Sequence, residues 1–176
     1  MAARHRLGVV LLVPDGLVAG IDGIRLALGD DALGRIPPHI TLVPPVNVRE
    51  DDLAQAFDLV HAAAGACPPL PLRLGPVATF APVNPVAYLA VSGEPGDLVR
   101  LVALKDALHA GPLDRPEDHE FVPHVTVATE LRDDRLAGAV AALADYRAEI
   151  TVERVHVLAE QPGRVWIPVA DAALRG

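Results

Sequence analysis

The hydrophobic residues of this 176-residue chain switch repeatedly between strand-like and helix-like spacing. Apolar residues run almost unbroken from Leu7 to Val13, which is typical of a buried strand. Later segments alternate between apolar and polar positions, and many of them are bounded by Pro or Gly. These patterns predict strands over residues 7–13, 39–43, 70–74, 77–80, 86–91, 121–129, 150–158 and 164–169.

Helix-like spacing fills the segments between these strands. Leu17–Leu28 has apolar residues at helical intervals, and Glu50-Asp51-Asp52 opens a helix through Ala64, because acidic residues stabilise a helix N-terminus. An Ala-rich helix is predicted over Asp133–Arg147. The helix Asp97–His109 is expected to bury Leu98, Leu101, Val102, Leu104 and Leu108. Strands and helices in this order predict an α+β fold, with residues 1–176 forming one unit of two lobes.

Two proline-containing segments are expected to end or turn strands. Pro44-Pro45 is predicted to stop the strand at 39–43, because proline has no N–H to donate to a neighbouring strand. Gln161-Pro162-Gly163 is predicted to join the last two strands as a hairpin.

The N-terminus has two possible interpretations. Arg4-His5-Arg6 followed by the apolar run resembles the start of a secretory signal peptide. However, the run is short, Pro14-Asp15 ends it, and no convincing small-residue cleavage site follows. A buried first strand is therefore expected. No apolar stretch approaches the ~20 residues of a membrane span, so we expect a cytoplasmic protein that makes no membrane contact.

Charge and cysteine content restrict the partners. The net charge is −8 and Lys105 is the only lysine, whereas proteins that follow a nucleic-acid backbone need basic stripes. A DNA duplex is thus not expected as a partner, although a nucleotide or an RNA end needs only a local positive site. Cys67 is the only cysteine, so the chain has no intrachain disulfide. The sequence sets no oligomeric state.

One short motif occurs twice. Pro38-His39-Ile40-Thr41-Leu42 recurs in the second half of the chain as Pro123-His124-Val125-Thr126-Val127. In a strand, residues i and i+2 lie on one face about 7 Å apart. Each copy therefore presents an imidazole beside a hydroxyl, and Ile40 or Val125 points into the core. Two such strands facing one cleft would surround a small anionic group with two His and two Thr side chains.

The residue types of the motif suit proton transfer around such an anionic group. Attack of water on an anionic ester requires one group to deprotonate the water and another to protonate the departing oxygen. Histidine can do either near neutral pH, and Thr hydroxyls can donate to the oxygens of that ester where charge accumulates. Because two imidazoles handle both protons and no set of ligands has metal spacing, we expect no metal or other cofactor.

The paired His-x-Thr motifs resemble those of the two-histidine (2H) phosphoesterase superfamily, whose bacterial branch includes 2′-5′ RNA ligase and cyclic phosphodiesterase proteins. Residues 121–128, the helix before them and the hairpin at 80–91 carry the resemblance. It implies two pseudo-symmetric lobes, each an antiparallel sheet with outer helices, around a central groove. It also implies that His39 and His124 are general acid and base, and that Thr41 and Thr126 hold the phosphate.

The implied activity is a metal-independent hydrolase that opens 2′,3′-cyclic phosphates, or cleaves or forms 2′-5′ links, in ribonucleotides or RNA ends. Two departures leave the substrate open. Val43-Pro44-Pro45 follows the first motif where ligase-type members tend to have an aromatic residue, and Thr129-Glu130 follows the second where a basic residue is frequent. The alternatives are a non-catalytic module that binds a nucleotide or RNA end, and a protein-interaction domain.

Other residues have a functional and a structural interpretation. Trp166, Tyr88, Phe80 and Phe121 could stack on a base, but core positions are favoured. Arg35 could reach a phosphate or be solvated. A metal site formed by Glu117, Asp118, His119 and Glu120 is weighed against a solvated loop, which is favoured. His109 is expected at a helix C-terminus and His156 in a structural position.

Overall fold

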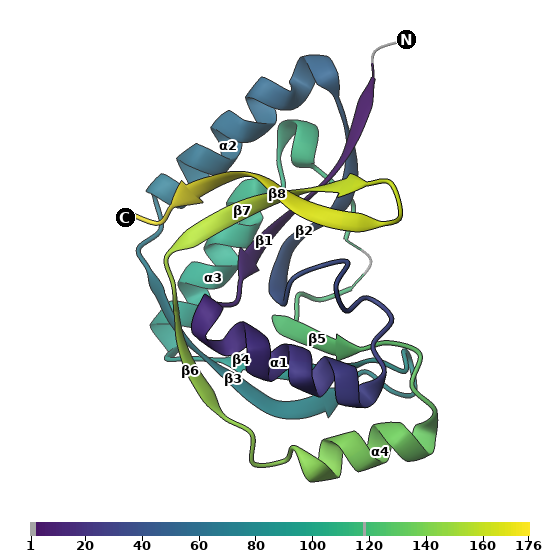
Figure 1. The fold of residues 1–176 in the computed structure, drawn as a ribbon. Helices are drawn as coiled ribbons and strands as arrows, with labels where there is room; N and C mark the ends of the chain where they lie inside the picture. Colours follow the sequence, from purple (N-terminus) through teal and green to yellow (C-terminus); the bar gives the residue numbers. More distant parts are fainter. Residues whose placement is uncertain (1–2, 118) are drawn as a thin grey trace.

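The computed structural model describes residues 3–117 and 119–176 (Figure 1). Its strands are β1 (Arg4–Leu12), β2 (His39–Arg49), β3 (Leu70–Thr79), β4 (Ala87–Ser92), β5 (His124–Ala128), β6 (Ala148–Val152), β7 (Arg154–Gln161) and β8 (Val165–Ala173). Its helices are α1 (Asp15–Leu28), α2 (Leu53–Gly65), α3 (Pro95–Leu108) and α4 (Asp133–Ala142), with short 3-10 turns at Glu50–Asp52 and Gly111–Leu113.

The eight strands form one antiparallel sheet in the order β6-β3-β4-β5-β2-β1-β7-β8. The two halves of this order, β6-β3-β4-β5 and β2-β1-β7-β8, meet where β2 lies beside β5. A single residue pair, Ile40 with Val125, joins these two strands, whereas β1 and β2 share eight pairs. The α+β class predicted from the sequence is confirmed. The two lobes that the family resemblance implies correspond to the two halves of the sheet.

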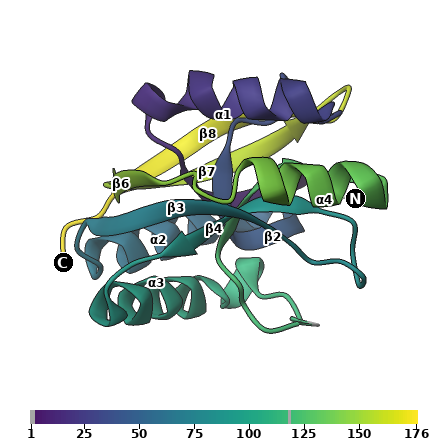
Figure 2. The ribbon, with the colours of Figure 1, turned by 90° about the horizontal axis from the view of Figure 1, so that it is seen from below.

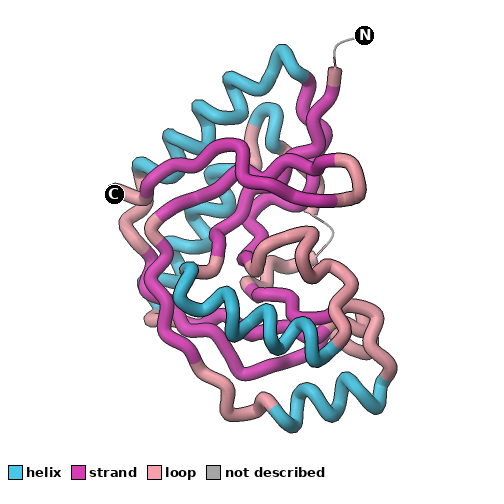
Figure 3. Tube along the Cα trace, in the orientation of Figure 1, coloured by secondary structure: helices cyan, strands magenta, loops and turns pink. Residues whose placement is uncertain are grey.

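The helices lie on the outside of the strands (Figure 3). α2 and α3 contact each other, α1 packs against β5, and α4 packs against β3 and β4. Figure 2 shows α1 and α3 on opposite sides of the strands. Within residues 3–117 and 119–176, no helix combines the length and the apolar character needed to cross a membrane.

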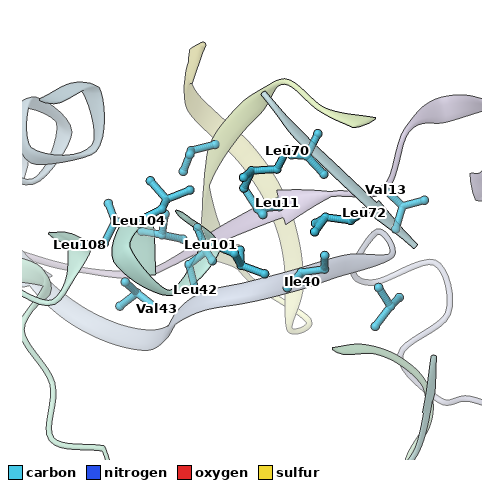
Figure 4. Packing of buried hydrophobic residues seen from close by; sticks show 14 of the residues in the cluster. Leu11, Val13, Ile40, Leu42, Val43, Leu70, Leu72, Leu101, Leu104 and Leu108 are labelled. Atoms are coloured by element: carbon cyan, nitrogen blue, oxygen red, sulfur yellow. The ribbon is translucent and has the colours of Figure 1, made fainter. Parts of the chain in front are cut away.

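Core packing fixes which way the motif strand β2 faces. Ile40 and Leu42 are at most 2% exposed and alternate with the half-buried His39 and Thr41. Leu42 packs with Leu101 and Leu104 of α3 (Figure 4). Full burial of each such side chain contributes about 1.5–3 kcal/mol. Because successive side chains of a strand point to opposite faces, this burial turns the imidazole and the hydroxyl away from the core.

The apolar N-terminal run is a strand, as expected. β1 buries Leu7, Val9 and Leu11, and it pairs with β2 on one side and β7 on the other. The run thus forms the centre of one half of the sheet.

The prediction that Pro44-Pro45 ends the strand is wrong. β2 continues to Arg49, and the two prolines lie at an irregularity where the partner of β1 jumps from Val43 to Val46. A proline is tolerated in a strand at such a bulge, since no N–H is required there. The extension carries Pro45 to the edge of the groove described below.

The predicted strand over 150–158 is in fact two strands. β6 pairs with β3 in one half of the sheet, and β7 pairs with β1 in the other half. Glu153 separates them, and the chain crosses between the halves at this point. The predicted hairpin is confirmed, since β7 and β8 are antiparallel neighbours on either side of residues 162–164.

Three smaller expectations also need correction. The segments 70–74 and 77–80 form one strand, β3, with an irregularity between Leu74 and Val77. The last helix ends at Ala142, because residues 143–147 turn into β6. Val102 of α3 is 43% exposed and lies outside the core, whereas Leu101, Leu104 and Leu108 are buried as predicted.

Candidate active site

The four motif side chains come together at the junction of the two halves of the sheet. Because Ile40 pairs with Val125 in antiparallel register, Thr41 lies opposite His124 and His39 lies opposite Thr126. Ile40 and Val125 are fully buried, and all four polar side chains alternate with buried residues. The two imidazoles and two hydroxyls therefore share the face that points away from the core.

His39 and His124 lie on a diagonal of this arrangement. At the spacing of an ordinary antiparallel pair, diagonal neighbours are about 7–8 Å apart and directly opposite neighbours about 5 Å apart. The positive charge of His124 lowers the pKa of His39, so the two rings are near enough to interact. This diagonal separation suits two groups on opposite sides of one phosphate.

Both histidines are held in the same way. His39 Nδ1 lies 2.8 Å from the Pro37 carbonyl oxygen, and His124 Nδ1 lies 2.7 Å from the Val122 carbonyl oxygen. A carbonyl oxygen accepts only, so Nδ1 must carry the hydrogen in each ring. In the neutral ring Nε2 is then the nitrogen with a free lone pair, and it is available to a ligand.

The environment of each imidazole disfavours its protonated form. Burial lowers the pKa of His39, and the charges of Arg25 and His124 lower it further, against the opposing effect of the Pro37 carbonyl. Burial also lowers the pKa of His124, against the opposing effect of the Val122 carbonyl. Two nearby cations lower the pKa of His39 in addition to burial, whereas burial alone lowers that of His124. Of the two histidines, His39 is therefore the better candidate for the one that is neutral when the reaction begins.

A buried ion pair supports the segment that leads into His39. Arg25 of α1 is 3% exposed, and its Nε donates to Asp30 Oδ2 at 2.7 Å. Its Nη1 donates to Asp22 Oδ1 at 2.9 Å and to the Ile36 carbonyl oxygen at 3.0 Å. Arg25 thereby fixes the chain three residues before His39. The sequence analysis missed this residue, although an arginine on the apolar side of a predicted helix was a usable signal.

Aromatic rings surround His124 instead. Phe80 and Tyr88 are stacked with their centroids 4.2 Å apart, and the His124 ring lies edge-on to them at 5.0 Å and 5.3 Å. Tyr88 is 9% exposed, in agreement with its predicted core position, and it pairs with Thr126 across β4 and β5. The duplicated motif is therefore set in two different environments.

The prediction that Trp166 belongs to the core is wrong. Trp166 is half-buried and lines a small pocket together with His39, Thr41, Gly8 and Val10. It also lines an adjoining groove of about 390 Å³. The indole lies beside β1 at Gly8, since a Cβ built at Gly8 would be in van der Waals contact with Trp166 Cζ3, at 3.7 Å.

Other candidate residues have different surroundings. Arg35 lies at the groove and forms an ion pair with Asp31 at 3.2 Å. His109 caps the C-terminus of α3, as expected, and its Nε2 lies 3.0 Å from the Leu42 carbonyl oxygen of β2. Glu117 pairs with the buried Lys105, whose ammonium lies 5.5 Å from the centre of the Phe121 ring.

The acidic loop at residues 117–120 was considered as a metal site in the sequence analysis. Among residues 3–117 and 119–176, no group of three or more His, Cys, Asp or Glu side chains could hold a metal ion. Asp118, one member of the weighed set, lies outside the described residues.

Comparison with known proteins decides the family. The family model described as the 2'-5' RNA ligase superfamily matches residues 13–164, which include both motifs. The chain belongs to the 2′-5′ RNA ligase superfamily. A superfamily relative from Bacillus cytotoxicus, named "Putative phosphoesterase", is 31% identical over 163 residues that cover 92% of each chain.

Solved structures show the same fold at lower identity. TT0787 of Thermus thermophilus has a TM-score of 0.61 and 20% identity, covering 97% of this chain and 98% of the other. Escherichia coli LigT complexed with 3′-AMP has a TM-score of 0.60 and 17% identity, covering 99% of this chain and all of the other. LigT has also been solved with NADP+ and with ATP. The superfamily match is the expected one, because it places this chain in the 2H phosphoesterase superfamily that the paired motifs resemble.

Proposed function

We propose that this protein is a metal-independent phosphoesterase that opens 2′,3′-cyclic phosphates, or cleaves or forms 2′-5′ phosphodiester links, in ribonucleotides or RNA ends. The observation that carries the proposal is the arrangement of His39 and His124 on one face across the Ile40–Val125 pair. Each ring has its Nδ1 bound to a backbone carbonyl, which leaves each Nε2 for proton transfer.

His39 acts as the base and His124 as the acid. His39 Nε2 takes a proton from water, and the water oxygen attacks phosphorus as the bond from phosphorus to the ribose 2′ oxygen breaks. Protonated His124 gives its Nε2 proton to that departing oxygen, so charge and atoms balance and the product is a 3′-phosphate. Nearby positive charge acts on His39 alone, which favours its neutral form in this pairing.

Thr41 and Thr126 donate to the non-bridging oxygens. Neither hydroxyl takes part in a side-chain hydrogen bond within the described part of the chain, and each lies directly across from a histidine. Negative charge grows on these oxygens in the transition state, so a donor already in place lowers the barrier without a reorganisation cost. No metal is required, because the two imidazoles account for both proton transfers.

A nucleotide is the substrate class that the relatives favour. LigT, which has the same fold, binds 3′-AMP, a nucleoside monophosphate that resembles the product of opening a cyclic phosphate. The net charge of −8 and the single lysine fit a short ligand better than a long nucleic acid.

The test is incubation of the protein with 2′,3′-cyclic nucleotides and with 2′-5′-linked dinucleotides, in the presence of a chelator. Separation of the products should show conversion of at least one class, with the same rate before and after chelation. Binding without turnover would indicate a nucleotide-binding module instead. Activity that returns only with added Zn²⁺ or Mn²⁺ would contradict the two-histidine mechanism.

A further inference from the structure

Trp166 lines both the small pocket beside His39 and the adjoining groove. The small pocket that contains His39 and Thr41 shares Trp166, Ile36 and Pro45 with the adjoining groove. The groove volume of about 390 Å³ lies within the range of small-molecule sites. A ligand whose phosphate lies between the histidines would therefore extend along the indole into this groove.

The indole is held in place. Its ring lies beside β1 at Gly8, and the Trp166 backbone N–H donates to the Arg35 carbonyl oxygen at 2.7 Å. Arg35 belongs to the segment that Arg25 anchors through the Ile36 carbonyl, and the same segment leads into His39. The position of the indole is thus linked to that of the catalytic face through a few backbone contacts.

The charges of the groove are balanced. It contains three arginines and three acidic residues, of which Arg6 pairs with Glu160 at 3.1 Å and Arg35 with Asp31 at 3.2 Å. Arg164 and Glu130 form no ion pair within the described residues. A chain of phosphates would meet as many carboxylates as guanidiniums there, so the groove does not suit a polyanion.

The two unpaired charged residues share a backbone feature. Within the described residues, Glu130 and Arg164 are the non-glycine residues with positive φ, at 55° and 60°. The φ of Arg164 belongs to the β7–β8 turn, where Gly163 also has a positive φ, and Glu130 follows the end of β5. Both residues line the groove together with Trp166, and they bring one carboxylate acceptor and one guanidinium donor to it.

We propose that this groove is a nucleobase subsite, with Trp166 as the stacking platform and Arg164 and Glu130 as the groups that contact the edge of the base. A nucleobase is flat, uncharged and rich in both donors and acceptors, which matches each observed feature of the groove. This inference rests on the proposed function, since it assigns the part of a nucleotide substrate beyond the phosphate. It would make Trp166 the main determinant of affinity for the nucleoside.

The first test uses fluorescence, because Trp166 is the only tryptophan in the chain. The His124→Ala variant, in which turnover is suppressed, is titrated with 2′,3′-cyclic AMP and with ethylene phosphate, a cyclic phosphate without a base. Saturable quenching by the nucleotide and none by ethylene phosphate is expected. Quenching does not require catalysis, so this result would stand even if the proposed enzymatic function failed. An unchanged emission at saturating nucleotide would overturn the subsite.

The second test is kinetic. Base stacking on an aromatic side chain corresponds to about a 5- to 140-fold change in affinity. Trp166→Leu should lower the ratio of kcat/KM for 2′,3′-cyclic AMP to kcat/KM for ethylene phosphate by about this factor. Trp166→Phe should retain most of the ratio, which guards against loss of folding in the Leu variant. Ile167→Ala, at an exposed neighbouring position of β8 that does not line the groove, is the matched control.

The outcomes separate the two proposals. An equal loss of both activities in Trp166→Leu, or no change in the ratio, would show a structural role and overturn the nucleobase subsite. Hydrolysis of cyclic nucleotides by the wild-type protein would still support the proposed function in that case. A fall in the ratio that Phe restores supports the subsite directly.

Discussion

Ile40 pairs with Val125, and this contact joins β2 to β5 in the described sheet. Both residues are fully buried, and each is flanked by the His and Thr of its motif. One residue pair therefore sets the register of all four candidate catalytic side chains. A shift of one residue in either strand would turn its His and Thr into the core.

The first prediction concerns the two histidines. His39→Ala and His124→Ala should each lower kcat/KM for a 2′,3′-cyclic nucleotide by about 10²–10⁴-fold, because each removes one proton transfer. His61→Ala is the matched control, since His61 is an exposed histidine of α2 that bonds only to its own helix. Retention of full activity in both motif variants would show that the paired motif is structural.

The two threonines should have a smaller effect. Thr41→Val and Thr126→Val keep the shape of the strand and delete a hydroxyl, so the expected loss in kcat is about 10–10³-fold, as for a lost transition-state donor. Steady-state rates of the two variants are compared with those of Thr151→Val, an exposed threonine on β6. A change in KM with kcat unaffected would mean that the hydroxyls bind the ground state and the transition state equally.

The alternation within each motif was enough to predict that His39 and Thr41 share one face of their strand and that His124 and Thr126 share one face of theirs. Such a pattern is local, and the buried Ile40 and Val125 determine it. The break between β6 and β7 was also encoded, since the buried positions shift from Ile150 and Val152 to Val155 and Val157, an odd interval. That signal is weak, because apolar and polar residues alternate on both sides of it, and it was overlooked.

The local pattern of apolar and polar residues does not reveal contacts between segments that are distant in the sequence. Pro44-Pro45 looked like the end of a strand because the bulge that accommodates them depends on the register with β1. Trp166 looked like a core residue because its neighbour Gly8 lies on another strand, more than 150 positions away in the sequence. Arg25 and Asp30 are close in sequence, but their burial depends on the surrounding fold.

The pH dependence of kcat/KM follows from the two imidazoles. The active form has one ring neutral and the other protonated, so the rate falls at high pH as the acid is lost and at low pH as the base is lost. The pKa of His39 and that of His124 are both lowered from 6.5. Both limbs of the bell, and the optimum between them, are therefore expected below about pH 6.5. An optimum well above pH 7 in rate measurements on the free enzyme would contradict the assigned environments.

Arg25 should matter for both stability and activity. Arg25→Met leaves Asp30 buried without its partner, so the free energy of unfolding should fall by about 3–5 kcal/mol. Urea denaturation measures this change. Arg73→Met removes an ion pair with Glu149 that lies in solvent and is screened by it, so it should lower the free energy of unfolding far less. A loss at Arg25 no greater than at Arg73 would show that the buried pair does not support the segment before His39.

The last prediction separates the acid from the base. A 2′-deoxyribonucleoside 3′-phosphodiester of p-nitrophenol has no 2′ hydroxyl, so water is the nucleophile, and its good leaving group needs little protonation of the departing oxygen. Because His124 is assigned as the acid, His124→Ala should recover most of its lost rate on this substrate relative to one with a poor leaving group. His39→Ala should remain slow on both, since the attacking water must still be deprotonated. Release of p-nitrophenolate is followed by its absorbance. Recovery in His39→Ala instead of His124→Ala would reverse the assignment, and recovery in neither would mean that both histidines act by binding the phosphate.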